Sequence, residues 1–171
     1  IIIAREKKSC IDSLKKQLES VFILIVDSPE DAFLKLAHAW RSQFSYPVVG
    51  VTGSVGKTST KEMIGAILST ANIPHIVSQA NQNTPLGLAL NIFKMRAHHQ
   101  IAVFEVGISV RGEMKLLAQI LKPTTGIITC IGHAHMQGLG SLTDIAHEKR
   151  NLFAYLDEGM VGIINGDQQL L

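Results

Sequence analysis

Short runs of valine and isoleucine alternate with longer segments of helical spacing along most of this chain. Five runs are expected to be strands: Val48–Thr52, Pro74–Val77, Ile101–Val106, Gly126–Ile131 and Met160–Asn165. Their apolar residues are mostly continuous rather than alternating, which is typical of strands that helices cover on both faces. The chain is therefore predicted to form a doubly wound α/β domain with a mostly parallel sheet. Such a domain binds its ligands beyond the carboxyl ends of its strands.

Helices are expected between these strands, at about Ser59–Thr70, Leu86–Met95, Gly112–Leu121 and Thr143–Leu156. The first of them has an apolar stripe at helical spacing, formed by Met63, Ile64, Ile67 and Leu68. Another helix is expected to begin at Ser28-Pro29 and to end near Phe44, because serine before proline is a favourable helix start.

Residues 1–27 do not continue this alternation. Ile1–Ala4 and Val21–Val26 have the pattern of strands, and Ser9–Glu19 that of a helix between them. We interpret residues 1–27 as the end of a preceding domain, and residues 28–171 as the domain that contains the predicted sheet.

The composition excludes several classes of protein. With 46% hydrophobic residues the chain can bury a core, and a formal net charge of +2 with scattered Lys and Arg residues gives no reason to expect a nucleic-acid partner. Two cysteines, Cys10 and Cys130, are too few for a disulfide framework. The longest apolar run, Val21–Val26, is too short to span a membrane. We therefore expect a soluble cytoplasmic protein, monomeric and without a membrane partner.

A glycine-containing loop follows the first predicted strand of the sheet. The segment Gly53-Ser54-Val55-Gly56-Lys57-Thr58 lies between a buried strand and an amphipathic helix, as a phosphate-binding loop does. In such a loop backbone N–H groups converge on phosphate oxygens, the lysine contacts the β- and γ-phosphates, and the Thr58 hydroxyl binds Mg²⁺. The general pattern also requires a glycine where Val51 stands, so an ordinary strand-to-helix turn is the alternative interpretation.

Other polar residues follow the later strands. Glu105 ends an apolar strand, so its carboxylate is expected to face the loop and to hold Mg²⁺ directly or through water, unless it is a surface acid. His133 and His135 follow the next strand, but their spacing alone is a weak metal signal. The residues around Lys149 indicate a solvated, charged helix face.

The loop T-G-x-x-G-K-[TS] after a short apolar strand resembles that of the Mur ligase family, which joins amino acids or peptides to cell-wall precursors. Further segments resemble the family's motifs in the same order: Asn81-Gln82-Asn83-Thr84, Phe104-Glu105-Val106-Gly107, Arg111-Gly112-Glu113, Ile131-Gly132-His133-Ala134-His135, Glu148-Lys149 and Asn165-Gly166-Asp167. The resemblance covers roughly residues 20–171 in collinear order, so it is far more specific than any one motif.

The resemblance implies an ATP-dependent amide-bond ligase of peptidoglycan precursor synthesis. The segment Thr52–Glu62 is most similar to members that add D-alanyl-D-alanine to a UDP-N-acetylmuramoyl-tripeptide through an acyl phosphate. Residues 28–171 would then be part of a central ATP-binding domain. The family's C-terminal ligase domain would lie outside this chain, so we expect the chain alone to bind nucleotide weakly and not to ligate.

The resemblance also implies roles for individual residues. The nucleotide would be bound by Thr52, Gly53, Ser54, Val55, Gly56, Lys57, Thr58, Ser59 and Asn165. Mg²⁺ would be held by Thr58, Glu105, His135 and Lys149, of which His135 and Lys149 are catalytic together with Lys57. Lys149 matches a lysine that is carbamylated in the family, a modification that requires an uncharged amine. Asn83 and Thr84 would bind the precursor.

Several residues differ from the family's pattern. Cys130 stands where the family often has Asn, Gln137 and Asn151 where it often has Glu, and Ala80 replaces a frequent Gly. These differences leave a degenerate, non-catalytic nucleotide-binding paralogue as an alternative hypothesis. A sibling amide ligase of the folylpolyglutamate synthase type is a second alternative, although its loop tends to read TGTNGKGS, unlike Thr58-Ser59-Thr60-Lys61-Glu62.

Overall fold

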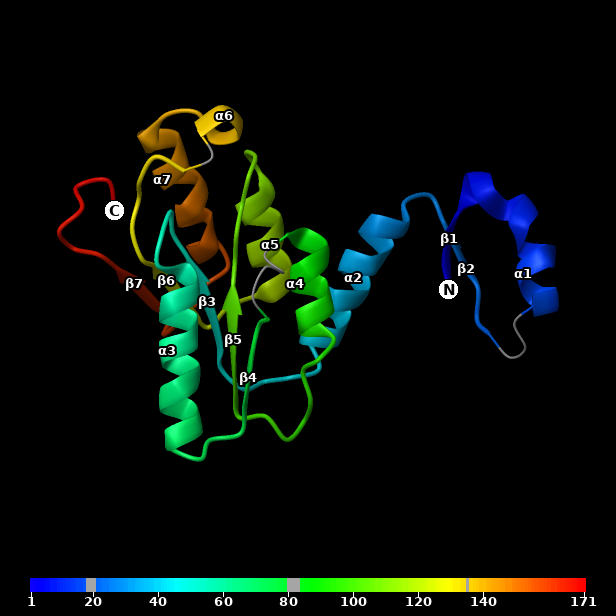
Figure 1. Ribbon diagram of the computed structural model, residues 1–171, viewed down its shortest axis with the longest axis horizontal. Helices are drawn as coiled ribbons and strands as arrows, with labels where there is room; N and C mark the ends of the chain where they lie inside the picture. The colour runs from blue at the N-terminus through cyan, green and yellow to red at the C-terminus, as the bar shows by residue number, and fades with distance from the viewer. Residues whose placement is uncertain (18–20, 80–83, 135) are drawn as a thin grey trace.

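The computed structural model describes residues 1–17, 21–79, 84–134 and 136–171 (Figure 1). Its main sheet has five parallel strands in the order β4-β5-β3-β6-β7. The strands are β3 (Val48–Thr52), β4 (His75–Val77), β5 (Ile101–Glu105), β6 (Thr125–Ile128) and β7 (Val161–Ile164). The predicted fold class is therefore confirmed, and each predicted strand of the sheet is present within a few residues of its expected ends.

The helices between the strands also lie where the sequence predicts them. They are α2 (Pro29–Arg41), α3 (Lys57–Thr70), α4 (Pro85–Ile92), α5 (Glu113–Leu121) and α7 (Leu142–Arg150). The short helix α6 (Met136–Leu139) was not predicted, and the 3-10 turn η2 (Asn151–Phe153) lies within the predicted helix Thr143–Leu156. The last helix ends before the predicted Leu156, because the chain tightens into η2 and buries Leu152 completely. Among the described residues, no helix is long and apolar enough to cross a membrane.

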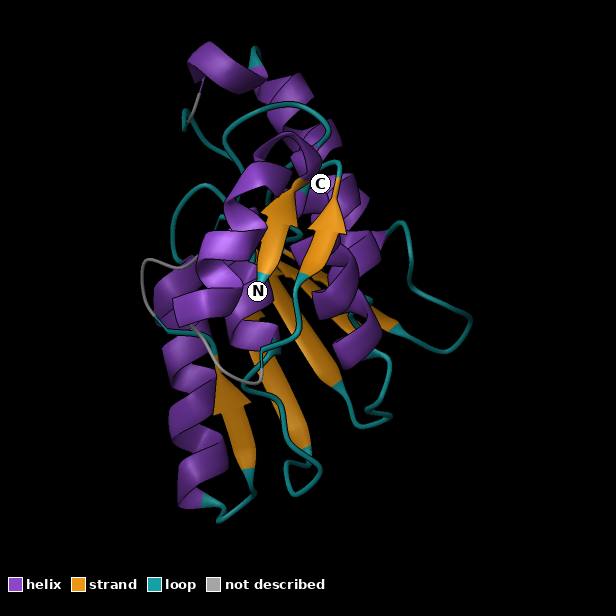
Figure 2. Cartoon of the chain, turned by 90° about the vertical axis from the view of Figure 1, so that its right-hand side faces the viewer, coloured by secondary structure: helices purple, strands orange, loops and turns teal. Residues whose placement is uncertain are grey.

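Helices cover both faces of the sheet, as Figure 2 shows. On one face Val49 and Val51 of β3 pack with Val103 of β5 against α3. On the other face Val48 and Phe104 belong to a larger core that includes residues of α2, α4, α5 and α7. Successive residues of a strand point to opposite faces, so a continuous apolar run supplies both cores.

The predicted apolar stripe of α3 is partly wrong. Met63 and Ile67 are 65% and 66% exposed, whereas Ile64 and Leu68 do pack against the sheet. The buried face instead includes Gly65, where an added Cβ would lie 2.9 Å from Val77 Cγ2. Because the helix approaches β4 through this glycine, Met63 and Ile67 are turned towards solvent.

Residues 1–26 form a separate, two-stranded parallel sheet. It consists of β1 (Ile2–Ala4) and β2 (Leu24–Val26), connected through the 3-10 helix η1 (Arg5–Cys10) and α1 (Ile11–Gln17). Figure 1 shows this blue unit on the far side of α2 from the main sheet. The predicted helix Ser9–Glu19 is thus a 3-10 turn followed by α1, and its last residues lie outside the described part of the chain. The predicted domain boundary at residue 27 stays a prediction.

A buried arginine fastens α2 to the end of α5. Arg41 is 7% exposed, and its guanidinium donates to Leu121 O at 2.8 Å, Lys122 O at 3.0 Å and Phe44 O at 2.6 Å. The last carbonyl groups of a helix lack partners within the helix, and a cation there also interacts favourably with the helix dipole. Arg41 therefore satisfies the end of α5 at the edge of the sheet where strands begin.

Replacing this arginine should destabilise the fold. We expect Arg41→Met to lower the free energy of unfolding by about 2–4 kcal/mol, because it leaves three carbonyl groups without their donor. Urea unfolding followed by circular dichroism measures this change. Arg96 is the matched control, since it donates to Phe93 O and Met95 O but is exposed. Arg96→Met should cost less than about 1 kcal/mol; equal losses in the two variants would contradict the role of Arg41.

Candidate functional site

The carboxyl ends of β3, β5 and β6 meet at one edge of the sheet, and the glycine-containing loop follows β3 there. Helix α3 begins at Lys57, two residues earlier than predicted, so Lys57 and Thr58 lie in its first turn. The Thr58 hydroxyl donates to Glu105 Oε2 at 2.7 Å. Glu105 is 7% exposed, so it is not the surface acid of the alternative interpretation. The predicted pair of magnesium ligands is therefore brought together, one from the first turn of α3 and the other from the end of β5.

The loop is held in shape by the segment that follows β6. Ser54 N donates to Cys130 O at 2.8 Å, Ser54 Oγ donates to Gly132 O at 3.0 Å, and Gly132 N donates back to Ser54 Oγ at 2.9 Å. Thr129 Oγ1 donates to Val55 O at 2.6 Å. The loop after β3 and the segment after β6 are thus joined by four hydrogen bonds that need no ligand.

Two lysines converge on one carbonyl oxygen of this loop. Lys57 Nζ lies 3.0 Å from Gly53 O, and Lys149 Nζ, from α7, lies 3.1 Å from the same atom. Lys149 is only 2% exposed, so it does not lie on the solvated, charged helix face that the surrounding residues indicate. Burial, followed by the charge of Lys57, lowers the pKa of Lys149 from 10.5 to about 8. Two ammonium groups this close together favour an anion between them, or the loss of one charge.

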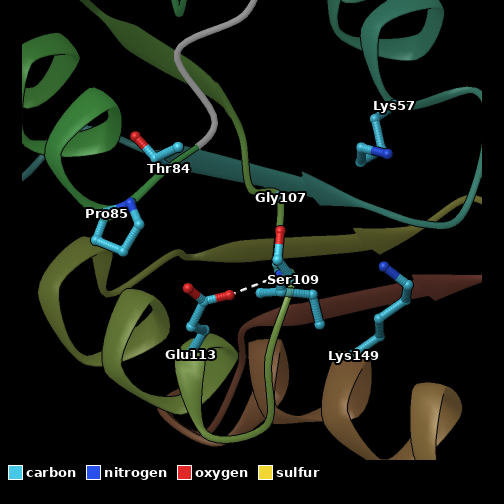
Figure 3. A pocket seen from close by; sticks show the side chains of 8 residues that line it. Lys57, Thr84, Pro85, Gly107, Ser109, Glu113 and Lys149 are labelled. Atoms are coloured by element: carbon cyan, nitrogen blue, oxygen red, sulfur yellow. Dashed lines mark hydrogen bonds between the residues drawn. The ribbon is translucent and has the colours of Figure 1, made fainter. Parts of the chain in front are cut away.

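A cavity of about 80 Å³ lies in front of these lysines (Figure 3). It is lined by Lys57, Thr84, Pro85, Gly107, Ile108, Ser109, Glu113 and Lys149. The carboxylate of Glu113 accepts from Ser109 N at 2.6 Å and from Val110 N at 3.0 Å, which shapes one wall. The predicted precursor-binding Thr84 therefore shares a cavity with the predicted catalytic lysines.

Thr84 has a structural task as well. It is the N-cap of α4, where its Oγ1 accepts from Gly87 N at 3.2 Å. A hydroxyl that accepts this bond keeps its own hydrogen as a donor. Thr84 is exposed, so that donor can serve a ligand.

The other predicted site residues lie at the same edge or outside the described residues. Thr52 is fully buried and its Oγ1 has no hydrogen-bond partner among the described residues, while Val55 is 69% exposed and Ser59 is exposed. Asn165 follows β7, where it is exposed and accepts from Asp167 N at 3.0 Å. The predictions for Asn83 and His135, and the difference at Ala80, fall outside the described residues.

The described residues bring together no group of three His, Cys, Asp or Glu side chains. His133 is exposed, with Nδ1 3.1 Å from Met136 Sδ. Of the residues that differ from the family's pattern, Gln137 is exposed and Cys130 Sγ lies 3.6 Å from Val55 O. Of the predicted metal ligands, the described residues include Thr58 and Glu105, whose side-chain oxygens meet, and Lys149, whose Nζ lies at Gly53 O.

Sequence reasoning missed two charged residues that shape this site. Glu148 is buried and its Oε1 accepts from Gly112 N at 2.9 Å and Met114 N at 3.0 Å, which caps the first turn of α5. This cap fastens α7 to α5 next to Lys149, and no local sequence signal predicts it. Lys61 is fully buried in α3. Its position three residues before Ile64 and seven before Leu68 was a signal that it belongs to the buried face.

Comparison with known proteins identifies the class to which this fold and site belong. The Mur ligase middle domain family matches residues 51–171. The chain therefore belongs to the Mur ligase family.

Within that family, the chain is similar to UDP-N-acetylmuramoyl-tripeptide–D-alanyl-D-alanine ligases. It is 40% identical over 153 residues to that ligase of Synechocystis sp., covering 90% of this chain and 34% of the relative. It is also 40% identical over 153 residues to that of Bacillus subtilis, covering 90% of this chain and 33% of the relative. The chain thus spans about a third of the length of these curated relatives.

Solved structures agree with this likeness. A crystal structure of MurF from Acinetobacter baumannii superposes with a TM-score of 0.79 at 31% identity, over 88% of this chain and 33% of that one. MurF ligase from Thermotoga maritima in complex with ADP superposes with a TM-score of 0.82 at 27% identity, over 98% of this chain and 43% of that one. The fold described above is therefore the fold of these ligases.

The first loop glycine provides a test of how tightly the loop is held. Gly53 has φ +150°, and an added Cβ would overlap Thr129 Oγ1 and lie 3.2 Å from Cys130 N. We expect Gly53→Ala to lower the free energy of unfolding by about 2–4 kcal/mol, through both strain and overlap. Gly159→Ala is the matched control, because Gly159 has φ +88° but nothing within 4 Å of an added Cβ. Gly159→Ala should lower the free energy of unfolding by about 1 kcal/mol. Similar losses in the two variants would show that the overlap of the added Cβ with Thr129 is relieved.

Proposed function

We propose that this chain is the ATP-binding part of a ligase that adds D-alanyl-D-alanine to a UDP-N-acetylmuramoyl-tripeptide. The observation that carries the proposal is the convergence of Lys57 and Lys149 on Gly53 O, at the phosphate loop and beside the Thr58–Glu105 pair. The names of the relatives support the reaction and substrates, and the ADP complex of the Thermotoga maritima ligase supports the nucleotide. The presence of these lysines and oxygen ligands together argues against a degenerate paralogue.

In this proposal the backbone of residues 52–59 and the positive end of α3 bind the phosphates of ATP. Lys57 reaches the β- and γ-phosphates by leaving the carbonyl groups of Gly53 and Ser54, to which it now donates at 3.0 and 3.5 Å. Lys57 thereby exchanges two neutral carbonyl acceptors for negatively charged phosphate oxygens, and this exchange favours nucleotide binding. Asn165 would contact the base at the end of β7.

The residues present also fit Mg²⁺. Hard cations prefer oxygen ligands, and the Thr58 hydroxyl and Glu105 carboxylate place two such oxygens 2.7 Å apart at the mouth of the loop. Thr58 and Glu105 would hold the ion, with Lys149 as a carbamate and His135 completing a second site. Bound Mg²⁺ would neutralise part of the charge on the phosphates.

The reaction in this proposal has two steps. The terminal carboxylate of the precursor attacks the γ-phosphorus of ATP, forming an acyl phosphate and releasing ADP. The amine of D-alanyl-D-alanine then attacks the acyl carbon, forming the amide, losing a proton and releasing phosphate. The first step brings two anions together, so the role of Lys57 is to stabilise charge on the transferring oxygens. The hydroxyl of Thr84, in the same cavity, orients the precursor.

A test of the nucleotide site is Lys57→Met. In calorimetry with a non-hydrolysable ATP analogue, we expect affinity to fall roughly 100-fold, because the charge-assisted bonds to phosphate are lost. In the complete ligase, ADP release should fall by about 1000-fold or more. Lys115→Met removes an exposed lysine of α5 and should change neither quantity.

Three outcomes would overturn the proposal. Unchanged turnover in Lys57→Met would exclude this loop as the reacting site. Nucleotide binding without amide formation by the complete ligase, supplied with the precursor and D-alanyl-D-alanine, would favour the non-catalytic alternative. Phosphate release with folates, and not with UDP-precursors, would favour the folylpolyglutamate synthase type.

The buried amine of Lys149 gives a pH-dependent prediction. A neutral amine and bicarbonate form a carbamate and water, so at a low, fixed bicarbonate concentration carbamate follows the neutral fraction of the amine. Because burial lowers the pKa of Lys149 to about 8, carbamate should rise with pH and reach half its maximum near pH 8. A lysine with the ordinary pKa of 10.5 would respond only at higher pH.

Carbon-13 NMR with labelled bicarbonate measures this titration. Lys149→Met keeps every exposed lysine and should remove the resonance. A resonance that survives this substitution, or one that first rises near the pKa of an exposed lysine, would contradict carbamylation at Lys149.

A further inference from the structure

Lys61 is completely buried although it carries an ammonium group. Its side chain is 0% exposed, and Nζ donates to Ser78 O at 2.7 Å and lies 2.8 Å from Glu62 Oε1. Glu62 is itself 61% exposed, so the ion pair is open to water on only one side. Burying an ammonium group costs several kcal/mol, and a methionine would fill similar space without that cost. The loop chemistry proposed above does not use Lys61, so its burial requires another reason.

The contacts of Lys61 form a closed circuit with the proposed metal ligands. Ser78 directly follows β4 and is 2% exposed. Its carbonyl accepts from Lys61, while its Oγ accepts from Glu105 N at 2.9 Å. The Glu105 carboxylate in turn accepts from Thr58, which lies one turn before Lys61 on α3. The circuit thus runs from α3 to the end of β4, to the end of β5 and back to α3.

This circuit determines how Glu105 lies relative to Thr58. Ser78 extends the pairing of β4 and β5 beyond the last strand residue, since Ser78 N donates to Val103 O at 2.9 Å. Lys61 holds that extension against α3 through the Ser78 carbonyl. Without the ammonium group, the Ser78 carbonyl loses its donor and the end of β5 loses one of its attachments to the helix that carries Thr58. A small shift there changes the spacing of the two oxygen ligands.

We propose that Lys61 is a positioning residue for Mg²⁺: it sets the separation of the Thr58 and Glu105 oxygens through Ser78, without touching the ion. This rests on the proposed function, which places Mg²⁺ and nucleotide at this site. Residues that orient metal ligands from outside the coordination shell commonly change metal affinity by about 10- to 100-fold when they are replaced.

The test is Lys61→Met, which keeps the unbranched side chain up to the position of Cε and removes the ammonium group. Binding of a non-hydrolysable ATP analogue to the chain is measured by calorimetry over a series of Mg²⁺ concentrations and in EDTA. We expect the Mg²⁺ concentration for half-maximal enhancement of binding to rise about 10-fold, with binding in EDTA unchanged. A residue that serves only stability would leave the Mg²⁺ dependence where it is.

Ser78→Ala interrupts the same circuit with a smaller change to the side chain. It keeps the backbone carbonyl that accepts from Lys61 and removes only the hydroxyl that accepts from Glu105 N. We expect the same direction of change in Mg²⁺ dependence. The double variant should be no worse than the more affected single variant, because both act through one circuit. If Lys61→Met does not fold, Ser78→Ala decides the question alone.

Two controls isolate the effect. Arg41→Met also removes a buried cation that donates to carbonyl groups, but at the opposite edge of the sheet, so it should lower stability without changing the Mg²⁺ dependence. Glu62→Gln neutralises the exposed partner of Lys61. It should change the Mg²⁺ concentration for half-maximal enhancement of binding by less than about 2-fold.

The outcomes separate the two levels of the proposal. If the wild-type chain shows no Mg²⁺-dependent nucleotide binding, the proposed metal site itself fails. If the wild type does show it, and both Lys61→Met and Ser78→Ala keep the wild-type Mg²⁺ dependence, the positioning role is wrong and Lys61 serves stability alone.

Discussion

The hydrogen bonds between the glycine-containing loop after β3 and the segment after β6 determine where the rest of the candidate site lies. Ser54 and Gly132 exchange two bonds, and Thr129 closes the loop at Val55. Because the loop is fixed in this way, Gly53 O is presented to both Lys57 and Lys149. A freely moving loop could not place one carbonyl oxygen between helices α3 and α7. The site therefore depends on the neighbouring positions of β3 and β6 in the sheet.

Much of this arrangement could be predicted from the sequence, because the information is local. Continuous Val and Ile runs specify buried parallel strands, and a glycine-containing turn between strand and helix is typical of a phosphate loop. The carboxyl ends of parallel strands share an edge, so Glu105 could be expected near Thr58. The burial of Lys149 and the cap that Glu148 provides to α5 could not be predicted, since both depend on how α7 packs against distant segments.

The misplaced stripe of α3 shows a different kind of limit. Met63 and Ile67 have the hydrophobicity of a buried face, but the helix meets β4 through Gly65 and buries Lys61 instead. Hydrophobic periodicity weighs side chains by type and so cannot favour a glycine and a lysine over a methionine and an isoleucine. Gly65 is buried because the helix approaches the strand closely there, and Lys61 is buried because it donates a hydrogen bond to a carbonyl group at the end of the strand. Such reversals of a local rule are expected near functional sites.

The charged groups buried at this edge also connect stability to ligand binding. Four charged side chains are buried here, which is unusual for charged groups: Lys61, Glu105, Glu148 and Lys149. Lys61, Glu105 and Glu148 each have hydrogen-bond partners of their own within the fold. Lys149 instead donates to the carbonyl oxygen of Gly53, which also accepts from Lys57. The repulsion between these two ammonium groups opposes folding, and an anion bound between them relieves it. Any anionic ligand that binds only the folded state therefore stabilises the domain by mass action, and most strongly at this edge of the sheet.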